Sequence, residues 1–233
     1  MIVAGIGWIS GEKCGAMRRG WQDEFKDANT LYGQLEEAGV FNTPAKKVRW
    51  FCDLAQRFCL ASALALRDAF DLPGHIALDP SKVGMLSLSR DGALKANLDY
   101  FKDYIESGRK SARGNLFIRT LPTSSLAQVA MTFGFKGPIV HLSSAAPELG
   151  HLADRSDALE NRIEGLNLLS CVADDKTVIC FFLKPAEMSE GIYSTSELKD
   201  QVGKLWNLDE VLETLKIAML PFQKNKISGN VKL

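Results

Sequence analysis

The chain has 233 residues, of which 46% are hydrophobic and 24% charged, and its formal net charge is zero. This length suits one α/β domain, and the balanced charge gives no reason to expect binding to nucleic acid or an anionic membrane surface. No apolar run reaches the length of a membrane-spanning helix, and the apolar start lacks the basic residues of a signal peptide. We therefore expect a cytoplasmic protein without membrane insertion.

The five cysteines are odd in number and scattered, which favours reduced thiols over a disulfide framework. Cys52 and Cys59 lie seven residues apart on a predicted helix, with no CxxC pair and no histidine beside them. The sequence therefore predicts no metal site and no cofactor, and most of the cysteines are expected in the core.

The first third of the chain predicts a strand and a long helix. Residues 1–10, "MIVAGIGWIS", form an apolar strand, and residues 13–25, "KCGAMRRGWQDEF", are weakly helical. Residues 48–72 form a strong helix that Pro73 and Gly74 are expected to end. Its apolar positions recur at steps of three and four, and they are Leu54, Phe58, Ala61, Ala65 and Ala69.

The middle of the chain alternates strands and helices. Residues 82–89, "KVGMLSLS", are almost continuously apolar, as in a strand that is covered on both faces. Residues 91–114 form an amphipathic helix that ends in a basic loop. A short helix follows, with a cap among Thr123 to Ser125 and an end at Gly134.

The last third predicts three strands and two helical segments. Residues 139–144, "IVHLSS", form a strand, and a helix follows over residues 147–165. Residues 166–175 and 176–185 are apolar strands joined by a polar Asp-Asp-Lys turn, and a long helical tail begins near residue 190. Strands interleaved with helices indicate a layered α/β protein, with a mixed sheet in a single domain that spans all 233 residues.

Five segments, in order, resemble the N-terminal half of the β-ketoacyl synthases, the condensing enzymes of fatty acid and polyketide synthesis. They are "VAGIGWIS", "AQRFCLASALALRDA", "DPSKVGMLSLSRDGAL", "LPTSSLAQVAMTFGFKGP" and "IVHLSSAA". The last of these is similar to the strand that carries the nucleophile of that family. The resemblance runs from about Ile2 to Asp175 and implies half of a thiolase-like fold. It is most specific to short synthase-like proteins of aryl polyene gene clusters, which resemble truncated chain-length factors.

The resemblance implies a non-catalytic chain. The position of the family's nucleophilic cysteine falls on Ala146, whose methyl group has no lone pair with which to attack a thioester. Chain-length factors often carry glutamine there, and this chain does not. The two histidine motifs of the family's second half are missing, since the only histidines are His75, His141 and His151.

The resemblance also implies a partner. Ketosynthases are two-fold dimers in which the strand before the nucleophile pairs with its counterpart. The corresponding interface residues here are Ile139, Val140, His141, Leu142, Ser143 and Ser144. We therefore expect a heterodimer with a full-length ketosynthase, which would link this chain indirectly to an acyl carrier protein. Half a fold would also leave apolar strands, such as residues 178–183, without enough packed structure to bury them.

Within such a heterodimer, each subunit of the family lends side chains to the acyl tunnel of its neighbour. On this alignment the lent segment contains Leu116 and Leu121, with Arg90 and Asp91 in the facing turn. Two alternatives remain open. One is a stand-alone module that binds an acyl or aryl group. The other is a thioester hydrolase with a new nucleophile, such as Ser143 or Cys171.

Overall fold

A computed structural model describes residues 1–41, 51–70, 78–108, 113–144, 148–186, 192–205 and 207–224. Its strands are β1 (Ile2–Ser10), β2 (Lys13–Ala16), β3 (Trp21–Glu24), β4 (Val83–Ser89), β5 (Ile139–Ser143), β6 (Asn167–Ala173), β7 (Thr177–Lys184) and β8 (Tyr193–Ser194). They form one sheet in the order β3-β2-β1-β7-β6-β4-β5, with β8 paired to β1. Strand β4 is parallel to β5 and β6, and the other pairs are antiparallel.

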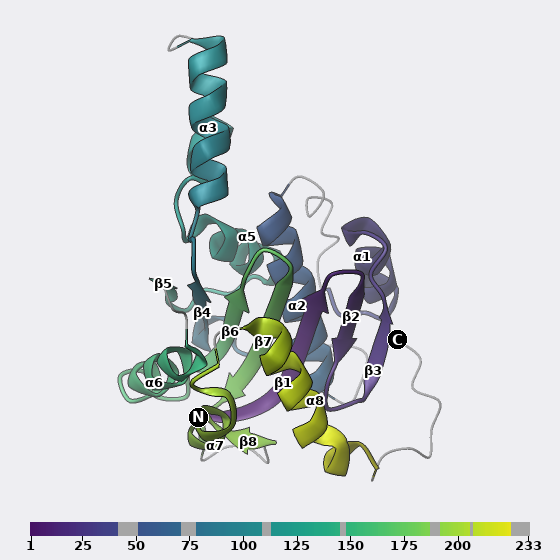
Figure 1. The fold of residues 1–233 in the computed structure, drawn as a ribbon. Coiled ribbons are helices and arrows are strands. Elements are labelled where there is room, and N and C mark those ends of the chain that lie inside the picture. Colours follow the sequence, from purple (N-terminus) through teal and green to yellow (C-terminus); the bar gives the residue numbers. More distant parts are fainter. Residues whose placement is uncertain are drawn as a thin grey trace.

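Helices cover both faces of this sheet (Figure 1). They are α1 (Ala28–Glu37), α2 (Asp53–Ala69), α3 (Leu94–Ser107), α4 (Gly114–Arg119), α5 (Ser124–Phe133), α6 (Leu149–Glu160), α7 (Thr195–Val202) and α8 (Leu208–Lys224), with a 3-10 turn at Pro80–Lys82. One core cluster joins α1, α2 and α5 to the first face, and a second joins α6, α7 and α8 to the other. The predicted layered fold with a mixed sheet is confirmed.

Helix α2 lies directly against β1, because two glycines leave room for it. A Cβ atom on Gly7 would lie 2.3 Å from the Ala61 carbonyl oxygen, and one on Gly5 would lie 2.3 Å from that of Ala65. Only small residues on both elements allow a helix and a strand to approach so closely. Nearly every residue of α2 is buried, and the predicted helix is confirmed from residue 53 to residue 69.

A buried carboxylate ties the same helix to the backbone around it. Asp68 on α2 accepts hydrogen bonds from the backbone N–H groups of Ile6, at 2.8 Å, and of Arg18 and Arg19, each at 3.0 Å. Burial raises the pKa of Asp68 to about 6, although the hydrogen bonds from the three N–H groups lower it. Asp68 thereby fixes β1 and the turn after β2 on the end of α2.

Residues 13–25 were expected to be weakly helical, and this prediction is wrong. They form the antiparallel strands β2 and β3, in which Cys14 lies opposite Asp23. Three of the four residues of β2 are buried, while most of β3 is exposed. Strand β3 forms one end of the sheet, where a polar strand is favourable because it discourages edge-to-edge association.

The expectation that residues 178–183 would lack cover is also wrong. Strand β7 is buried along its length, and its side chains alternate between the two core clusters. Helix α2 covers one face, and α8 covers the other with Leu208, Val211, Leu212, Leu215 and Met219. The predicted helical tail is thus two helices, α7 and α8, and α8 supplies the second layer.

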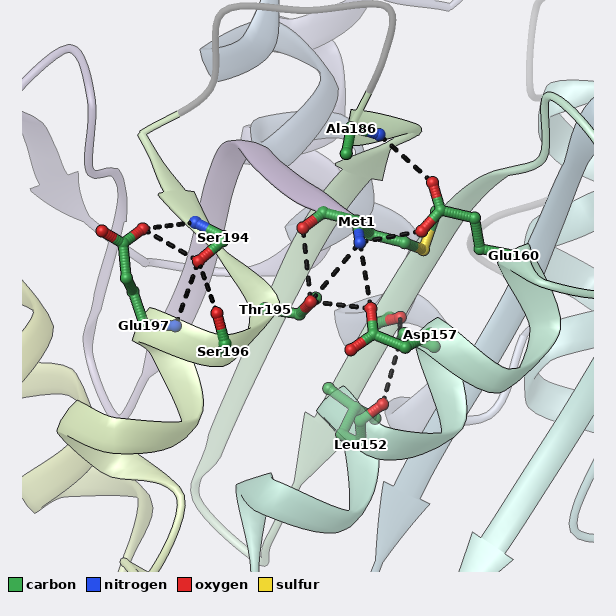
Figure 2. A network of polar contacts seen from close by, with 11 residues as sticks. Met1, Leu152, Asp157, Glu160, Ala186, Ser194, Thr195, Ser196 and Glu197 are labelled. Carbon is green, nitrogen blue, oxygen red and sulfur yellow. Dashed lines mark hydrogen bonds and ion pairs between the residues drawn. The ribbon is translucent and has the colours of Figure 1, made fainter.

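The start of β1 is held by a network of polar groups (Figure 2). The Met1 ammonium lies 3.0 Å from an Asp157 oxygen and 2.8 Å from a Glu160 oxygen, both on α6. Thr195, at the start of α7, donates to the same Asp157 oxygen at 2.7 Å. Burial lowers the pKa of the ammonium, but its bonds to Glu160 and Asp157 more than offset this, so the pKa lies above 8.0. The network joins β1, α6 and α7.

We expect Gly7→Ala to destabilise the fold by at least about 2 kcal/mol, because the new methyl group would meet the backbone of α2, which cannot move aside. Gly33→Ala is the matched control. Gly33 lies within α1 with nothing near the position of a Cβ, so this change should stabilise the fold by about 0.5–1 kcal/mol. Urea unfolding of both variants is the measurement, and equal midpoints would contradict the close contact of α2 with β1.

The Met1 network should make stability fall at alkaline pH. The ammonium has a raised pKa, so its contribution is complete below about pH 8 and is lost as the pH rises through the folded-state value. Urea unfolding between pH 7 and pH 10 should show this loss for the wild type. The double variant Asp157→Asn, Glu160→Gln should lose most of the dependence. If both proteins lose the same stability between pH 7 and pH 10, the Met1 network is not the source of that loss.

Candidate partner edge and adjoining cavity

Strand β5 lies at the end of the described sheet, and β4 is its one neighbour there (Figure 1). The side chains of Ile139 to Leu142 are half-buried, and that of Ser143 is exposed. Ser144 follows, and its N–H donates to the Ser89 carbonyl at 3.3 Å. All six residues predicted for the interface therefore lie along one edge, whose outer side has no strand among the described residues. Such an edge presents N–H and C=O groups to a further strand.

His141 lies in the middle of this edge. Its Nδ1 atom is 2.7 Å from the Ser87 hydroxyl on β4, and its Nε2 atom is buried without a hydrogen-bond partner in the described part of the chain. Burial lowers the pKa of His141, so the neutral imidazole is favoured at pH 7. The ring is thus bonded to Ser87, and no bond to Ser143 is found that would make it a base for that hydroxyl.

A cavity of about 510 Å³ opens where β4 and β6 end. Its lining includes all four residues that were predicted for an acyl-tunnel wall, namely Arg90, Asp91, Leu116 and Leu121. Cys52, Ser89, Ser125 and Ala173 line it as well, and Ser89 and Ala173 are the last residues of β4 and β6. The structure thus brings together residues from the turn before α3, from α4, and from the beginnings of α2 and α5.

Arg57 is a lining residue that the sequence did not single out. It is buried on α2, and it donates to the Asp175 carbonyl at 3.3 Å. Burial lowers the pKa of Arg57, and the charges of Asp53 and Asp174 partly offset this. A sequence pattern could not reveal the cluster, since α2 and the turn between β6 and β7 are more than 100 residues apart.

The β5 edge and the cavity meet at Gly92. The backbone φ of this residue is +55°, and its N–H donates to the Ser89 hydroxyl at 3.0 Å. A Cβ atom there would lie 3.2 Å from the Ser143 hydroxyl and 3.6 Å from His141 Nε2. Gly92 also lines the cavity, so the edge strand and the cavity form one continuous region of the surface.

The other predicted chemical positions lie apart from this region or outside the described residues. Ala146 and His75 belong to segments that are not described. Cys171 is completely buried between β6 and α2, with its sulfur 3.7 Å from the Ser62 hydroxyl, so it has no access to a substrate. His151 is exposed on α6. None of the described helices combines the length and hydropathy that are needed to cross a membrane.

Comparisons with known proteins support the fold assignment. No protein-family model matches the sequence, and no curated protein is significantly similar to it. Among solved structures, the ishigamide ketosynthase/chain length factor covers 82% of this chain with a TM-score of 0.57 and 12% identity. The ketosynthase ApeO in complex with its chain length factor ApeC from Xenorhabdus doucetiae covers 80%, with a TM-score of 0.50 and 10% identity.

A β-ketoacyl synthase from Burkholderia phymatum STM815 covers 80% of the chain, with a TM-score of 0.56 and 16% identity. The chain spans 63% of the matched ishigamide chain and 59% of the Burkholderia one, which is less than two thirds in each case. The structural resemblance to ketosynthases and chain length factors that the sequence indicated is confirmed. At these identities it establishes a shared fold.

We expect the thiol reagent DTNB to modify one thiol per native chain. Cys52 is half-buried and lines the cavity, whereas the other four thiols are buried, and burial raises the pKa of Cys14 and of Cys59 to about 12. Cys52→Ser should abolish the fast reaction, while Cys14→Ser should leave it unchanged. Fast reaction of several thiols in the folded protein would contradict the burial that the structure shows.

Proposed function

We propose that this chain is a non-catalytic subunit, similar to a chain-length factor, that pairs with a full-length ketosynthase. In that heterodimer it stabilises the ketosynthase and shapes its acyl tunnel. The observation that carries the proposal is the open edge of β5 beside a cavity lined by Leu116 and Leu121. Two of the similar solved structures are described as a ketosynthase with a chain length factor, which supports a partnership of this kind.

The β5 edge supports a partner for a physical reason. An unpaired strand edge associates readily with another strand, and half-buried apolar side chains such as Val140 and Leu142 add to that tendency. A second strand laid along β5 would pair the backbone groups and cover these side chains. It would also enclose the His141 ring, whose Nε2 atom lacks a bond within the described chain.

The cavity supports a role in holding an acyl group. Its volume falls in the range of about 300–1,000 Å³ that is common for small-molecule sites. Leu116 and Leu121 offer apolar contacts, and Arg90 and Asp91 lie on the facing turn. An acyl carrier protein would deliver the growing chain to the ketosynthase, so its contact with this subunit follows from the complex.

The absence of catalysis is part of the proposal. Alanine at position 146 offers no nucleophile, and carbon–carbon bond formation by the isolated chain would contradict it. We further propose that the complex acts in the cytoplasm in aryl polyene biosynthesis.

The second candidate is a stand-alone acyl-binding module, which the cavity within this one chain favours. That candidate would be supported if the isolated protein binds a fatty acid and if addition of a ketosynthase does not change the affinity.

We expect the chain to form a 1:1 complex when it is produced together with a co-encoded full-length ketosynthase. Val140→Lys and Leu142→Lys should weaken this complex, because each replaces an apolar side chain that a partner would cover with a charged one. The measurement is the mass in solution by light scattering. Lys216→Glu, on α8, serves as a control that should leave the complex intact. A monodisperse monomer that forms no complex with the co-produced ketosynthase would overturn the proposal.

We expect the side chains of the cavity to change the length of the product. Leu116→Trp should shorten the products of the complex, and Leu121→Ala should lengthen them, because a growing chain must fit before it is extended. Apolar pockets discriminate by about 1–3 kcal/mol per methylene, so the distribution should shift without a complete switch. Mass spectrometry of the products is the measurement.

The control for product length is Ile217→Trp on α8, whose side chain is exposed and outside the cavity lining. It should leave the product distribution unchanged. If both cavity variants also leave it unchanged while the complex assembles normally, this subunit stabilises its partner and does not set the length of the product.

A further inference from the structure

Helix α3 carries an apolar face that nothing in the described structure covers. Figure 1 shows α3 projecting beyond the rest of the molecule. No residue of this helix is buried, and four of its apolar side chains are between 50% and 76% exposed. We name them the α3 stripe: Leu94, Leu98, Phe101 and Ile105. Their spacing of four, three and four residues places them along one face, as in the seam between two paired helices.

The contacts that attach α3 to its own chain lie away from this stripe. Tyr100 packs against Phe117 of α4, with ring centroids 5.7 Å apart, and Asp103 forms an ion pair with Arg113. By the periodicity of the helix, Tyr100 and Asp103 point away from the face that carries Phe101 and Ile105. The stripe is therefore free of the contacts that hold α3 in place, and a second helix can approach it.

We propose that the α3 stripe docks against an amphipathic helix of the partner ketosynthase whose flanking residues are acidic. This inference rests on the proposed function and adds a determinant of partner choice. Four apolar side chains on a projecting helix form a contiguous surface of the kind that marks a protein interface. The charges beside the stripe decide which helix can occupy it.

One flank of the stripe is basic and the other is neutral. Lys95 and Lys102 follow Leu94 and Phe101 directly, and both are exposed. Asp99 and Glu106 lie one turn further along, behind these lysines and farther from the stripe. An incoming helix therefore meets two ammonium groups at the edge of the seam. Acidic residues at that edge of the incoming helix would form ion pairs with them.

The same charges oppose pairing between two copies of this chain. In an antiparallel pair of α3 helices, Lys95 of each copy would face Lys102 of the other, which gives two repulsive contacts. In a parallel pair, Lys102 would face Asn97 of the other copy and gain no ion pair. The stripe thus favours a partner of different sequence, since repulsion within the wrong pair is an effective means of specificity.

The test uses the full chain, with a co-encoded full-length ketosynthase as the probe. The double variant Phe101→Asp, Ile105→Asp should raise the Kd of the complex at least about tenfold, because it places charges in the seam. The matched control is Ile217→Asp, an exposed isoleucine on α8, which should leave the Kd unchanged. Far-UV circular dichroism should be the same for the wild type, the double variant and Ile217→Asp, since the altered side chains are exposed.

A charge reversal tests partner choice separately. Lys102→Glu should raise the Kd for the ketosynthase about threefold or more. It should also increase self-association in analytical ultracentrifugation, because Lys95 of one copy would then face the introduced carboxylate of the other. Lys136→Glu, which lies outside α3, should do neither. A photoreactive benzophenone side chain at position 101 should crosslink to the ketosynthase.

The outcomes separate this inference from the function on which it rests. If the wild-type chain forms no complex with the ketosynthase, the proposed function fails and this inference fails with it. If the complex forms and the stripe variants bind as tightly as Ile217→Asp, only the role of α3 is overturned. Crosslinking from position 101 to a second copy of this chain, or unchanged self-association of Lys102→Glu, would overturn the assignment of the stripe to a different partner.

Discussion

The direct contact of α2 with β1 is the constraint on which the rest of the structure depends. Gly5 and Gly7 allow the backbone of the strand to meet the backbone of α2, so neither element can shift without a clash. Asp68 then adds a polar tie to three backbone N–H groups around β1. Because β1 pairs with β2, β7 and β8, this one helix fixes the centre of the sheet. The residues at the N-terminal end of the same helix line the cavity, so α2 also positions part of the cavity wall.

The second face of the sheet explains how a chain of this length buries its strands. Helices α6, α7 and α8 supply a complete layer opposite α2. Both faces of β7 are therefore covered from within the chain, and the central strands do not need a partner to be buried. Large apolar side chains that are at least half exposed are most numerous on α3, and others lie on α4, α5 and α8 and at Leu121, whereas most side chains of β5 are half-buried. The partner that we propose would therefore contact particular surface elements and would not be needed to complete the core.

Elements with a strong apolar period could be predicted from the sequence, whereas contacts between distant elements could not. The strands at β1, β4, β6 and β7 are apolar over most of their length, α2 shows clear helical spacing, and α5 was marked by its capping residues and Gly134. Strand β3 escaped prediction because it is a polar edge strand, with no apolar face to give a period of two. The grouping of Leu116 and Leu121 with Arg90 came from the resemblance to ketosynthases. Periodicity also identified α3 as amphipathic, but it cannot tell an apolar face that meets the core from one that meets solvent.

Partner choice cannot be decided by the β5 edge alone. Backbone hydrogen bonds between strands are largely independent of sequence, so the edge could pair with a second copy of itself as well as with a different chain. Selectivity must come from side chains near the edge. On β5 these side chains are apolar or neutral, because burial lowers the pKa of His141 and favours its uncharged form. Lys95 and Lys102 are exposed on one flank of the α3 stripe, and like charges on that flank would penalise a second copy. In the heterodimer that we propose, the strand edge would supply affinity, and the projecting helix would supply the distinction between partners.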